Sequence, residues 1–144
     1  MIGDDIACDN KKSRWRPLAT AGEWEEEIDL RLRQVLKSKI HRATVTDANL
    51  EYIGSITIDQ DLLDAVDMWS GELVHVWNIT NGERFQTYAL SGERGSGMIR
   101  INGAGAHKAR KGDLVIVASF ALADEPVVPQ AILVDEDNRF VREL

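Results

Sequence analysis

Short apolar runs separated by turns rich in Gly and Asn fill the chain from Leu36 onward. The clearest example is the segment NITNGERFQTYAL, in which Asn81-Gly82 lies between two apolar runs. Asn-Gly in this setting is the strongest short-range signal for a β-hairpin, because both central residues of a type I′ turn need a positive φ. We therefore predict that residues 73–80 pair with residues 83–90.

The same pattern predicts strands through most of the chain. The run DLVIVASF is apolar on both faces, which is typical of a central strand. Asp59 can cap a short helix whose apolar face contains Leu62, Leu63 and Val66. Many short strands with only one or two short helices indicate a mainly β fold, a small closed β-barrel. The other predicted strands are 40–45, 52–58, 73–79, 83–90, 98–101 and 131–134, and after a turn at residues 136–138 we expect the C-terminus to fray.

The N-terminal residues have a different character. Residues 1–19 are polar and aperiodic, which predicts a disordered or loosely attached segment. Capping-box spacing at Thr20 and apolar residues at helical intervals predict a short helix over residues 22–34. We therefore expect a leader of residues 1–34 before one domain of residues 35–144, which is large enough to bury one core.

Composition excludes several classes of function. The net charge of −7 argues against nucleic acid or an anionic membrane as the main partner. Cys8 is the only cysteine in this sequence, so neither an internal disulfide nor a cysteine zinc site is predicted, and a reducing cytoplasm fits. Three scattered histidines lack ligand spacing, so we expect no metal site. No apolar run approaches the roughly 20 residues of a membrane span, and no secretory signal is evident.

The stretch YIGSITID contains the first candidate for chemistry, the Gly54–Ser55 bond. Gly within a strand usually marks a bulge or a close backbone approach. Gly is the least hindered carrier of an attacked carbonyl, its free φ admits strained geometry, and Ser55 supplies a nucleophile. The bond is therefore a candidate for self-cleavage through attack of Ser55 Oγ on the Gly54 carbonyl. Since Gly-Ser is also a common turn pair, the dipeptide alone does not decide between self-cleavage and a turn.

Five ordered blocks supply the missing context: KSKIHRATVT, YIGSITID, WNITNGERFQTYA, ERGSG and INGAGAHKARKGD. Over Val35 to Phe120 the sequence resembles the bacterial aspartate 1-decarboxylases, which make β-alanine from L-aspartate for pantothenate and coenzyme A synthesis. The resemblance implies a double-psi β-barrel and a homotetramer with active sites between subunits. It also implies self-cleavage into chains 1–54 and 55–144 and a covalent pyruvoyl cofactor made from Ser55. Some members need a partner protein for maturation.

The resemblance further implies roles for individual residues. Ser55 matches the serine that becomes pyruvoyl, and Gly54 matches the end of the released fragment. Tyr88 matches the proton donor, and Thr87 matches a residue that assists processing and contacts substrate. The remaining positions that match the family's substrate pocket are Lys39, Tyr52, Trp77, Arg84, Asn102, Gly103, Ala104 and Gly105, with His41 a nearby polar residue.

Physical arguments support these roles. A pyruvoyl ketone joined to the substrate amine is an electron sink comparable to pyridoxal phosphate, so no separately bound organic cofactor is needed. Arg84 is suited to bind one carboxylate of aspartate through two hydrogen bonds, and we expect this to be the side-chain carboxylate. Lys39 is suited to a point-charge contact with a carboxylate. The Tyr88 phenol can deliver a proton to Cα. The small residues 103–106 let backbone N–H groups approach the substrate closely.

Several alternatives stay open. Without the resemblance, Tyr88 and Trp77 would be core or interface aromatics, and Arg84 and Lys39 would be surface charges. The chain could also be a non-enzymatic barrel module of the same scaffold, or a pyruvoyl decarboxylase of another amino acid. The leader is either an appendage outside the barrel or the product of a translation start placed too early, with the true start near Leu30 or Val35.

Two positions depart from the family's pattern. Gly105 replaces what is more often alanine, and we expect a small effect because the N–H donor stays. Ile56 is apolar where a small polar residue is often found directly after the cleavage site, which puts the rate of processing in question.

Overall fold

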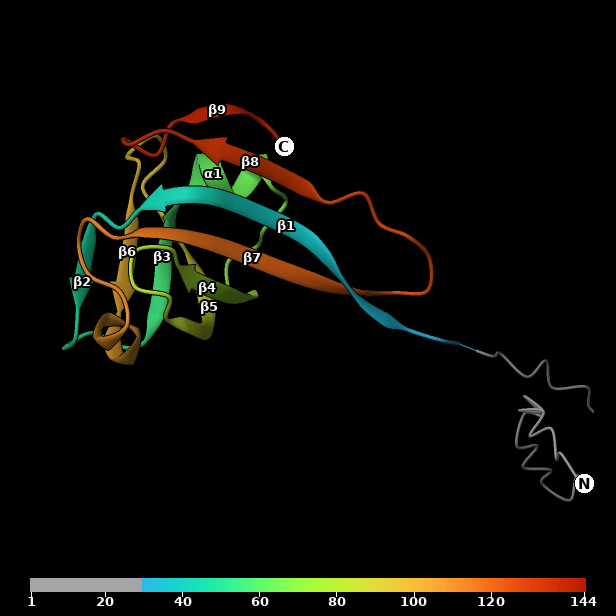
Figure 1. Ribbon diagram of the computed structural model, residues 1–144, viewed down its shortest axis with the longest axis horizontal. Helices are drawn as coiled ribbons and strands as arrows, with labels where there is room; N and C mark the ends of the chain where they lie inside the picture. The colour runs from blue at the N-terminus through green and yellow to red at the C-terminus, as the bar shows by residue number, and fades with distance from the viewer. Residues whose placement is uncertain (1–29) are drawn as a thin grey trace, which may run out of the picture.

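Residues 30–144 are described by the computed structural model, in which strands dominate (Figure 1). None of the helices in this part of the chain is long and apolar enough to cross a membrane. The elements are β1 (Arg33–Thr44), β2 (Asp47–Asn49), β3 (Ser55–Asp59), α1 (Gln60–Ala65), β4 (Leu73–Asn78), β5 (Arg84–Gly92), β6 (Ile99–Asn102), the 3-10 helix η1 (Gly103–His107), β7 (Leu114–Ala123), β8 (Gln130–Val134) and β9 (Phe140–Glu143).

The nine strands form one sheet in the order β2-β6-β3-β5-β4-β7-β1-β8-β9. Residues 45 and 46 alone separate β1 from β2, so the chain of β1 continues directly into the strand at the far end of this order. The Thr46 N–H donates to the Ile99 carbonyl at 2.8 Å and carries the ladder with β6 across this junction. The mainly β class is therefore confirmed, with β8 and β9 beside β1 (Figure 1), and the continuity of β1 with β2 is consistent with the predicted closed barrel.

Alternation along the strands decides which side chains form the core. Ile56 and Ile58 on β3 are fully buried in the hydrophobic cluster, together with Ile99 and Ile101 on the neighbouring β6. Because successive side chains of a strand point to opposite faces, Ser55 and the other odd-numbered residues of β3 face away from this cluster. The candidate nucleophile, Ser55, therefore lies on the outer face of the sheet.

The helix predicted over residues 22–34 is wrong at its C-terminal end. Residues 30–32 have no regular structure, and β1 begins at Arg33, whose partner in the antiparallel ladder with β7 is Ala123. Pairing with a strand far along the chain overrides the local helical periodicity. Residues 1–29, which include the rest of this helix and the predicted disordered segment, lie outside the described residues.

The predicted hairpin is confirmed, but its turn type is wrong. β4 and β5 pair antiparallel, with Leu73 opposite Tyr88 and Trp77 opposite Arg84, a register shifted by two residues from the one that a two-residue turn at Asn81-Gly82 would give. A longer loop connects them, in which Gly82 has a positive φ of 81° and Asn81 does not. The cause is Asn78, whose side-chain carbonyl accepts the Thr80 N–H at 2.9 Å and so turns the chain before the Asn-Gly pair.

Two further boundaries differ from the predicted ones. The strand predicted to begin at residue 52 begins at Ser55, and Tyr52 and Ile53 are exposed residues before it. The C-terminus, predicted to fray, forms β9, which pairs with β8. Short strands of this kind depend on a partner strand more than on their own sequence, which explains both errors.

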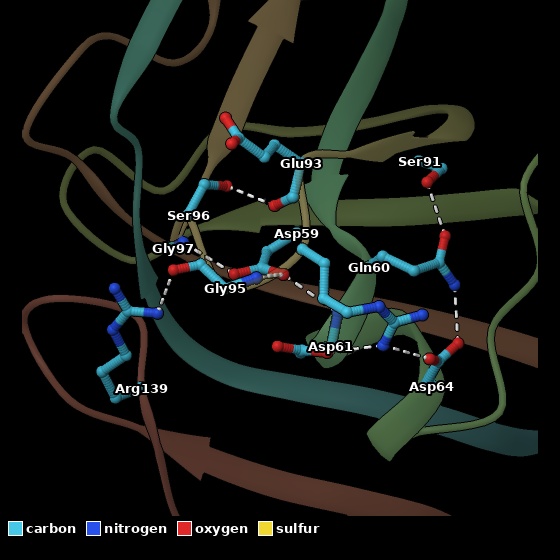
Figure 2. Close-up of polar contacts among 11 residues, drawn as sticks. Asp59, Gln60, Asp61, Asp64, Ser91, Glu93, Gly95, Ser96, Gly97 and Arg139 are labelled. Carbon is cyan, nitrogen blue, oxygen red and sulfur yellow. Dashed lines mark hydrogen bonds and ion pairs between the residues drawn. The ribbon is translucent and has the colours of Figure 1, made fainter.

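Asp59 anchors the end of β3 (Figure 2). Its side chain is 1% exposed and caps α1, as predicted, by accepting the Asp61 N–H at 2.9 Å. Figure 2 also shows this carboxylate facing the loop before β6, where it accepts the N–H groups of Gly95 at 2.9 Å and Gly97 at 2.6 Å. Three backbone donors from two segments therefore converge on one buried side chain and hold the end of β3 in place.

Asn138 fastens the same loop to the C-terminal turn. Its side-chain amide donates at 2.8 Å to the carbonyls of Thr44 and Gly97, and its carbonyl accepts the Thr44 N–H at 2.7 Å. The residue has a φ of 58°, which Asn tolerates better than most residues. The loop, β1 and the C-terminal turn are thus joined by one buried carboxamide.

Replacing Asp59 with Ala should destabilise the barrel by about 3 kcal/mol, because three N–H donors lose their acceptor and two of them belong to a part-buried loop. Urea unfolding followed by tryptophan fluorescence measures the change. The matched control is Asp64→Ala on the exposed side of α1, which should shift the midpoint far less. Equal midpoints for the two variants would contradict the assigned role of Asp59.

Candidate active site

Ser55 is the first residue of β3 and lies directly opposite Asn102 in the antiparallel ladder with β6. Both side chains are 1% exposed. The Asn102 side-chain amide donates to Ser55 Oγ at 2.8 Å and to Thr57 Oγ1 at 3.0 Å. Because Ser55 Oγ accepts this hydrogen bond, its own proton and one lone pair stay available. The candidate nucleophile is therefore buried, oriented and still able to react.

Gly103 brings a second segment against the scissile bond. Its φ is +64°, and a Cβ at this position would lie 2.8 Å from Gly54 Cα and from the Tyr52 carbonyl oxygen. Such contacts are too short for any side chain, so the backbone at the start of η1 packs directly on the backbone before Ser55. The predicted site residues Tyr52, Gly54, Ser55, Asn102 and Gly103 are thus brought together.

Gly54 itself does not have a left-handed φ in this structure. The left-handed φ values of the described glycines include Gly103 but not Gly54, and a Cβ on Gly54 would meet nothing closer than the Asn102 carbonyl oxygen at 3.9 Å. The left-handed conformation, which glycine adopts most easily, therefore belongs to Gly103, which packs against the scissile bond. It does not belong to Gly54, which carries the attacked carbonyl.

Tyr88 and Thr87 lie on the other neighbour of β3. In the parallel ladder between β3 and β5, Ile56 pairs with Ala89, so the register continued by one residue puts Tyr88 beside Ser55. Adjacent strands are about 4.8 Å apart, and partners in register share a face of the sheet. Tyr88, which is 39% exposed, thus shares the outer face with Ser55, whereas Thr87 alternates to the inner side.

The two predicted carboxylate ligands, Arg84 and Lys39, are on other parts of the sheet than Ser55. Arg84 stacks its guanidinium over Trp77 at 5.2 Å from the ring centroid, and it precedes Tyr88 by four residues, about 13 Å along β5. Lys39 is on β1, which β7 and β4 separate from β5, a distance of about 14 Å across the sheet. Within the described residues, neither Arg84 nor Lys39 forms a hydrogen bond with Ser55, and their place in the substrate pocket stays a prediction.

Gly105 has a packing role that the sequence did not show. A Cβ there would lie 2.9 Å from Phe85 Cε2 and 3.0 Å from Ile101 Cγ2. An alanine, the residue more common in the family, therefore requires the Phe85 ring to shift. The preceding residue, Ala104, is exposed in η1.

His41 lies in β1 at an irregularity where Arg42 has a φ of 63°. Burial lowers the pKa of His41, and the nearby charges of Lys39 and Arg42 lower this pKa further. The imidazole is therefore neutral at pH 7. Residues 30–144 contain no cluster of His, Cys, Asp or Glu that could hold a metal ion.

Thr57 is the contact that sequence reasoning missed. It shares the Asn102 amide with Ser55, yet a threonine is ordinary in a strand and nothing in the local sequence marks it. The one available signal was its position two residues after Ser55, which puts both side chains on one face.

The structure is that of a small, mainly β protein that buries a serine hydroxyl directly after a glycine, beside a side-chain amide donor. The chain belongs to the aspartate decarboxylase family, whose sequence profile matches residues 31–141. It is 55% identical over 112 residues to the aspartate 1-decarboxylase of Albidiferax ferrireducens, covering 75% of this chain and 83% of that protein. Aspartate 1-decarboxylases of Burkholderia pseudomallei and Burkholderia mallei are each 54% identical over 112 residues, covering 74% of this chain and 88% of theirs. The family predicted from the five sequence blocks is confirmed.

Gly103→Ala should destabilise the protein by about 2 kcal/mol or more, because the new Cβ adds a backbone collision to the cost of a positive φ. Gly82→Ala is the matched control, since Gly82 also has a positive φ but open space around it, and only the conformational cost of about 1 kcal/mol applies. The difference in stability loss between the two variants, measured by thermal unfolding, gives the cost of the collision. Equal losses would show that Gly103 does not press on the Gly54 backbone.

Proposed function

We propose that this protein is an aspartate 1-decarboxylase, which converts L-aspartate to β-alanine and carbon dioxide and so supplies pantothenate and coenzyme A synthesis. Membership of the family and relatives of that name over most of their length support this activity. The observation that carries the proposal is the buried Ser55 hydroxyl, paired with Asn102 on one side while Gly103 packs against the preceding backbone.

The active form arises by self-cleavage between Gly54 and Ser55. Ser55 Oγ forms a bond to the Gly54 carbonyl carbon, the amide C–N bond breaks, and the hydroxyl proton ends on the Ser55 nitrogen, which gives an ester. Loss of the Ser55 Cα proton then breaks the Cβ–Oγ bond, and Gly54 leaves as a carboxylate. Water replaces the nitrogen, which departs as ammonia, and residue 55 becomes a pyruvoyl group at the start of chain 55–144.

The residues present fit such a group. Asn102 Nδ2 donates to Ser55 Oγ, an oxygen that leaves with Gly54, so this N–H would be released for the new group, and Asn102 Oδ1 is a buried acceptor without a partner among the described residues. Asn102 and the backbone at Gly103 would hold the pyruvoyl group in place. When present, the group supplies a ketone that accepts the substrate amine and withdraws electrons as the carboxylate departs.

The chain's own side chains then bind and orient aspartate. Arg84, stacked on Trp77, grips the side-chain carboxylate through two parallel hydrogen bonds, and Lys39 adds a positive charge. Tyr88 delivers the proton to Cα from its phenol oxygen, since the register puts it beside residue 55. The backbone of Gly103, Ala104 and Gly105 contacts the substrate, and Thr87 assists processing and substrate binding.

We further infer a homotetramer with active sites between subunits. Arg84 precedes Tyr88 by four residues on β5, and β4 and β7 stand between β5 and the β1 strand of Lys39, an arrangement that supports a site completed by a second chain. Large apolar side chains on the outer surface support an interface, among them Tyr52, Trp69 and Leu73. The enzyme works in the cytoplasm on L-aspartate. A maturation partner protein is a further component to test in self-cleavage.

Purified protein should separate on a denaturing gel into two chains whose masses match 1–54 and 55–144, and the larger should resist Edman sequencing because a pyruvoyl end has no free amine. Ser55→Ala should leave one uncut chain and release no carbon dioxide from labelled aspartate. An active yet uncut protein would rule out the mechanism. An uncut, inactive wild type that stays uncut with cell extract would favour a non-enzymatic barrel module. Cleavage with a preference for glutamate or a neutral amino acid would reassign the substrate.

Co-expression tests the shared site. Ser55→Ala and Arg84→Ala should each be inactive alone, whereas mixed oligomers should regain about a quarter of wild-type activity, the share of sites that combine Ser55 from one variant with Arg84 from the other. The control is co-expression of Ser55→Ala with the double variant, which contains no intact combination. Absence of any recovery in stable mixed oligomers would place both residues of a site in one chain.

A further inference from the structure

Thr57 lies in the middle of β3, two residues after Ser55 and on the same face of the strand. Its Oγ1 accepts a hydrogen bond from Asn102 Nδ2 at 3.0 Å, while the same nitrogen donates to Ser55 Oγ at 2.8 Å. A carboxamide nitrogen carries two hydrogens, so each hydroxyl oxygen takes one. Asn102 is therefore shared equally between the candidate nucleophile and a residue to which no role is assigned.

The orientation of the Asn102 carboxamide depends on these two bonds. The residue is 1% exposed, and within the described part of the chain its Oδ1 has no hydrogen-bond partner. Nothing on the oxygen side opposes rotation of the group. The nitrogen side alone decides which atom faces Ser55, and Thr57 provides one of its two acceptors.

Gly92 leaves room for the rotamer that Thr57 adopts. A Cβ on Gly92, in the neighbouring strand β5, would lie 3.2 Å from Thr57 Cγ2, so the absence of a side chain at Gly92 makes room for this methyl group. A β-branched residue has few χ1 states, and seating the methyl group over Gly92 directs Oγ1 to Asn102. The acceptor is thus preorganised by the strand pairing.

We propose that Thr57 is a positioning residue for self-cleavage, which keeps the Asn102 N–H, and not its carbonyl oxygen, directed at Ser55 Oγ. This inference rests on the proposed function. When the ester breaks at the Cβ–Oγ bond, negative charge develops on Oγ, and a preorganised N–H donor stabilises it. A rotated carboxamide would face the same oxygen with its own partial negative charge and oppose the step.

Without the Thr57 hydroxyl, one buried N–H of Asn102 has no acceptor, and the bond to Ser55 Oγ alone is left to fix the orientation of the carboxamide. The step most affected is then breakdown of the ester, because the charge on Oγ develops there. A Thr57 variant should therefore accumulate ester, whereas a general loss of stability would slow every step alike. This difference separates a positioning role from a structural one.

The experiment uses the full chain with Thr57→Val, which keeps the shape and removes the hydroxyl, and with Thr57→Ser, which keeps the hydroxyl. Conversion to chains 1–54 and 55–144 is followed by intact mass, and hydroxylamine is added to cut any ester, which leaves a Gly54 hydroxamate and a free amine on Ser55. Thr57→Val should form the pyruvoyl chain about tenfold more slowly, the rate equivalent of one hydrogen bond, and show an ester fraction. Thr57→Ser should process at close to the wild-type rate.

Wild-type kinetics in Thr57→Val would overturn the inference and leave the proposed function intact, as would a slow variant with no trapped ester and a lowered melting temperature. A wild type that never cleaves would instead defeat the proposed function, and this inference with it. If Thr57→Val does not fold, Thr57→Cys replaces it, since a thiol is a poor acceptor. Equal rates for Thr57→Cys and Thr57→Ser would then overturn the inference.

Discussion

The antiparallel pairing of β3 with β6 is the constraint on which the site depends. It puts Ser55 opposite Asn102 and, at the next positions, Ile56 opposite Ile101. Burial of the isoleucine pair in the core excludes a slip of one residue, because such a slip would turn Ser55 into the core and the isoleucines outward. Packing of the isoleucines on the inner face therefore fixes the register that aligns Ser55 with Asn102 on the outer face.

The two ends of β3 are held by different means. At the far end, the buried Asp59 carboxylate gathers backbone N–H groups from α1 and from the loop before β6, and Asn138 ties that loop to β1. At the near end, Gly103 packs without a side chain against Gly54. One end is thus fixed by hydrogen bonds, whereas the other is a bare contact between backbones that leaves the Gly54 carbonyl close to its nucleophile.

Several features could be predicted because their causes are local. The cap at Asp59, the β4–β5 hairpin and the alternation that separates Ser55 from its isoleucine neighbours each follow from residues close together in sequence. Where a distant partner intervened, the prediction was wrong: β7 pairs with residues that have helical spacing, and β8 orders a C-terminus predicted to fray. The predicted turn type after β4 was wrong because the Asn78 side chain accepts the Thr80 N–H and so turns the chain before it reaches the Asn-Gly pair.

Strand periodicity and ordered motif blocks are properties of the linear chain, so residue order alone was enough to identify the mainly β class, the family and the Gly54–Ser55 bond. The three-dimensional arrangement was needed to show that Asn102 divides its two N–H groups between Ser55 and Thr57 and that the left-handed conformation belongs to Gly103. These are relations between strands, and the strand order brings together segments that are far apart in sequence. No local pattern encodes which residue will lie across the ladder.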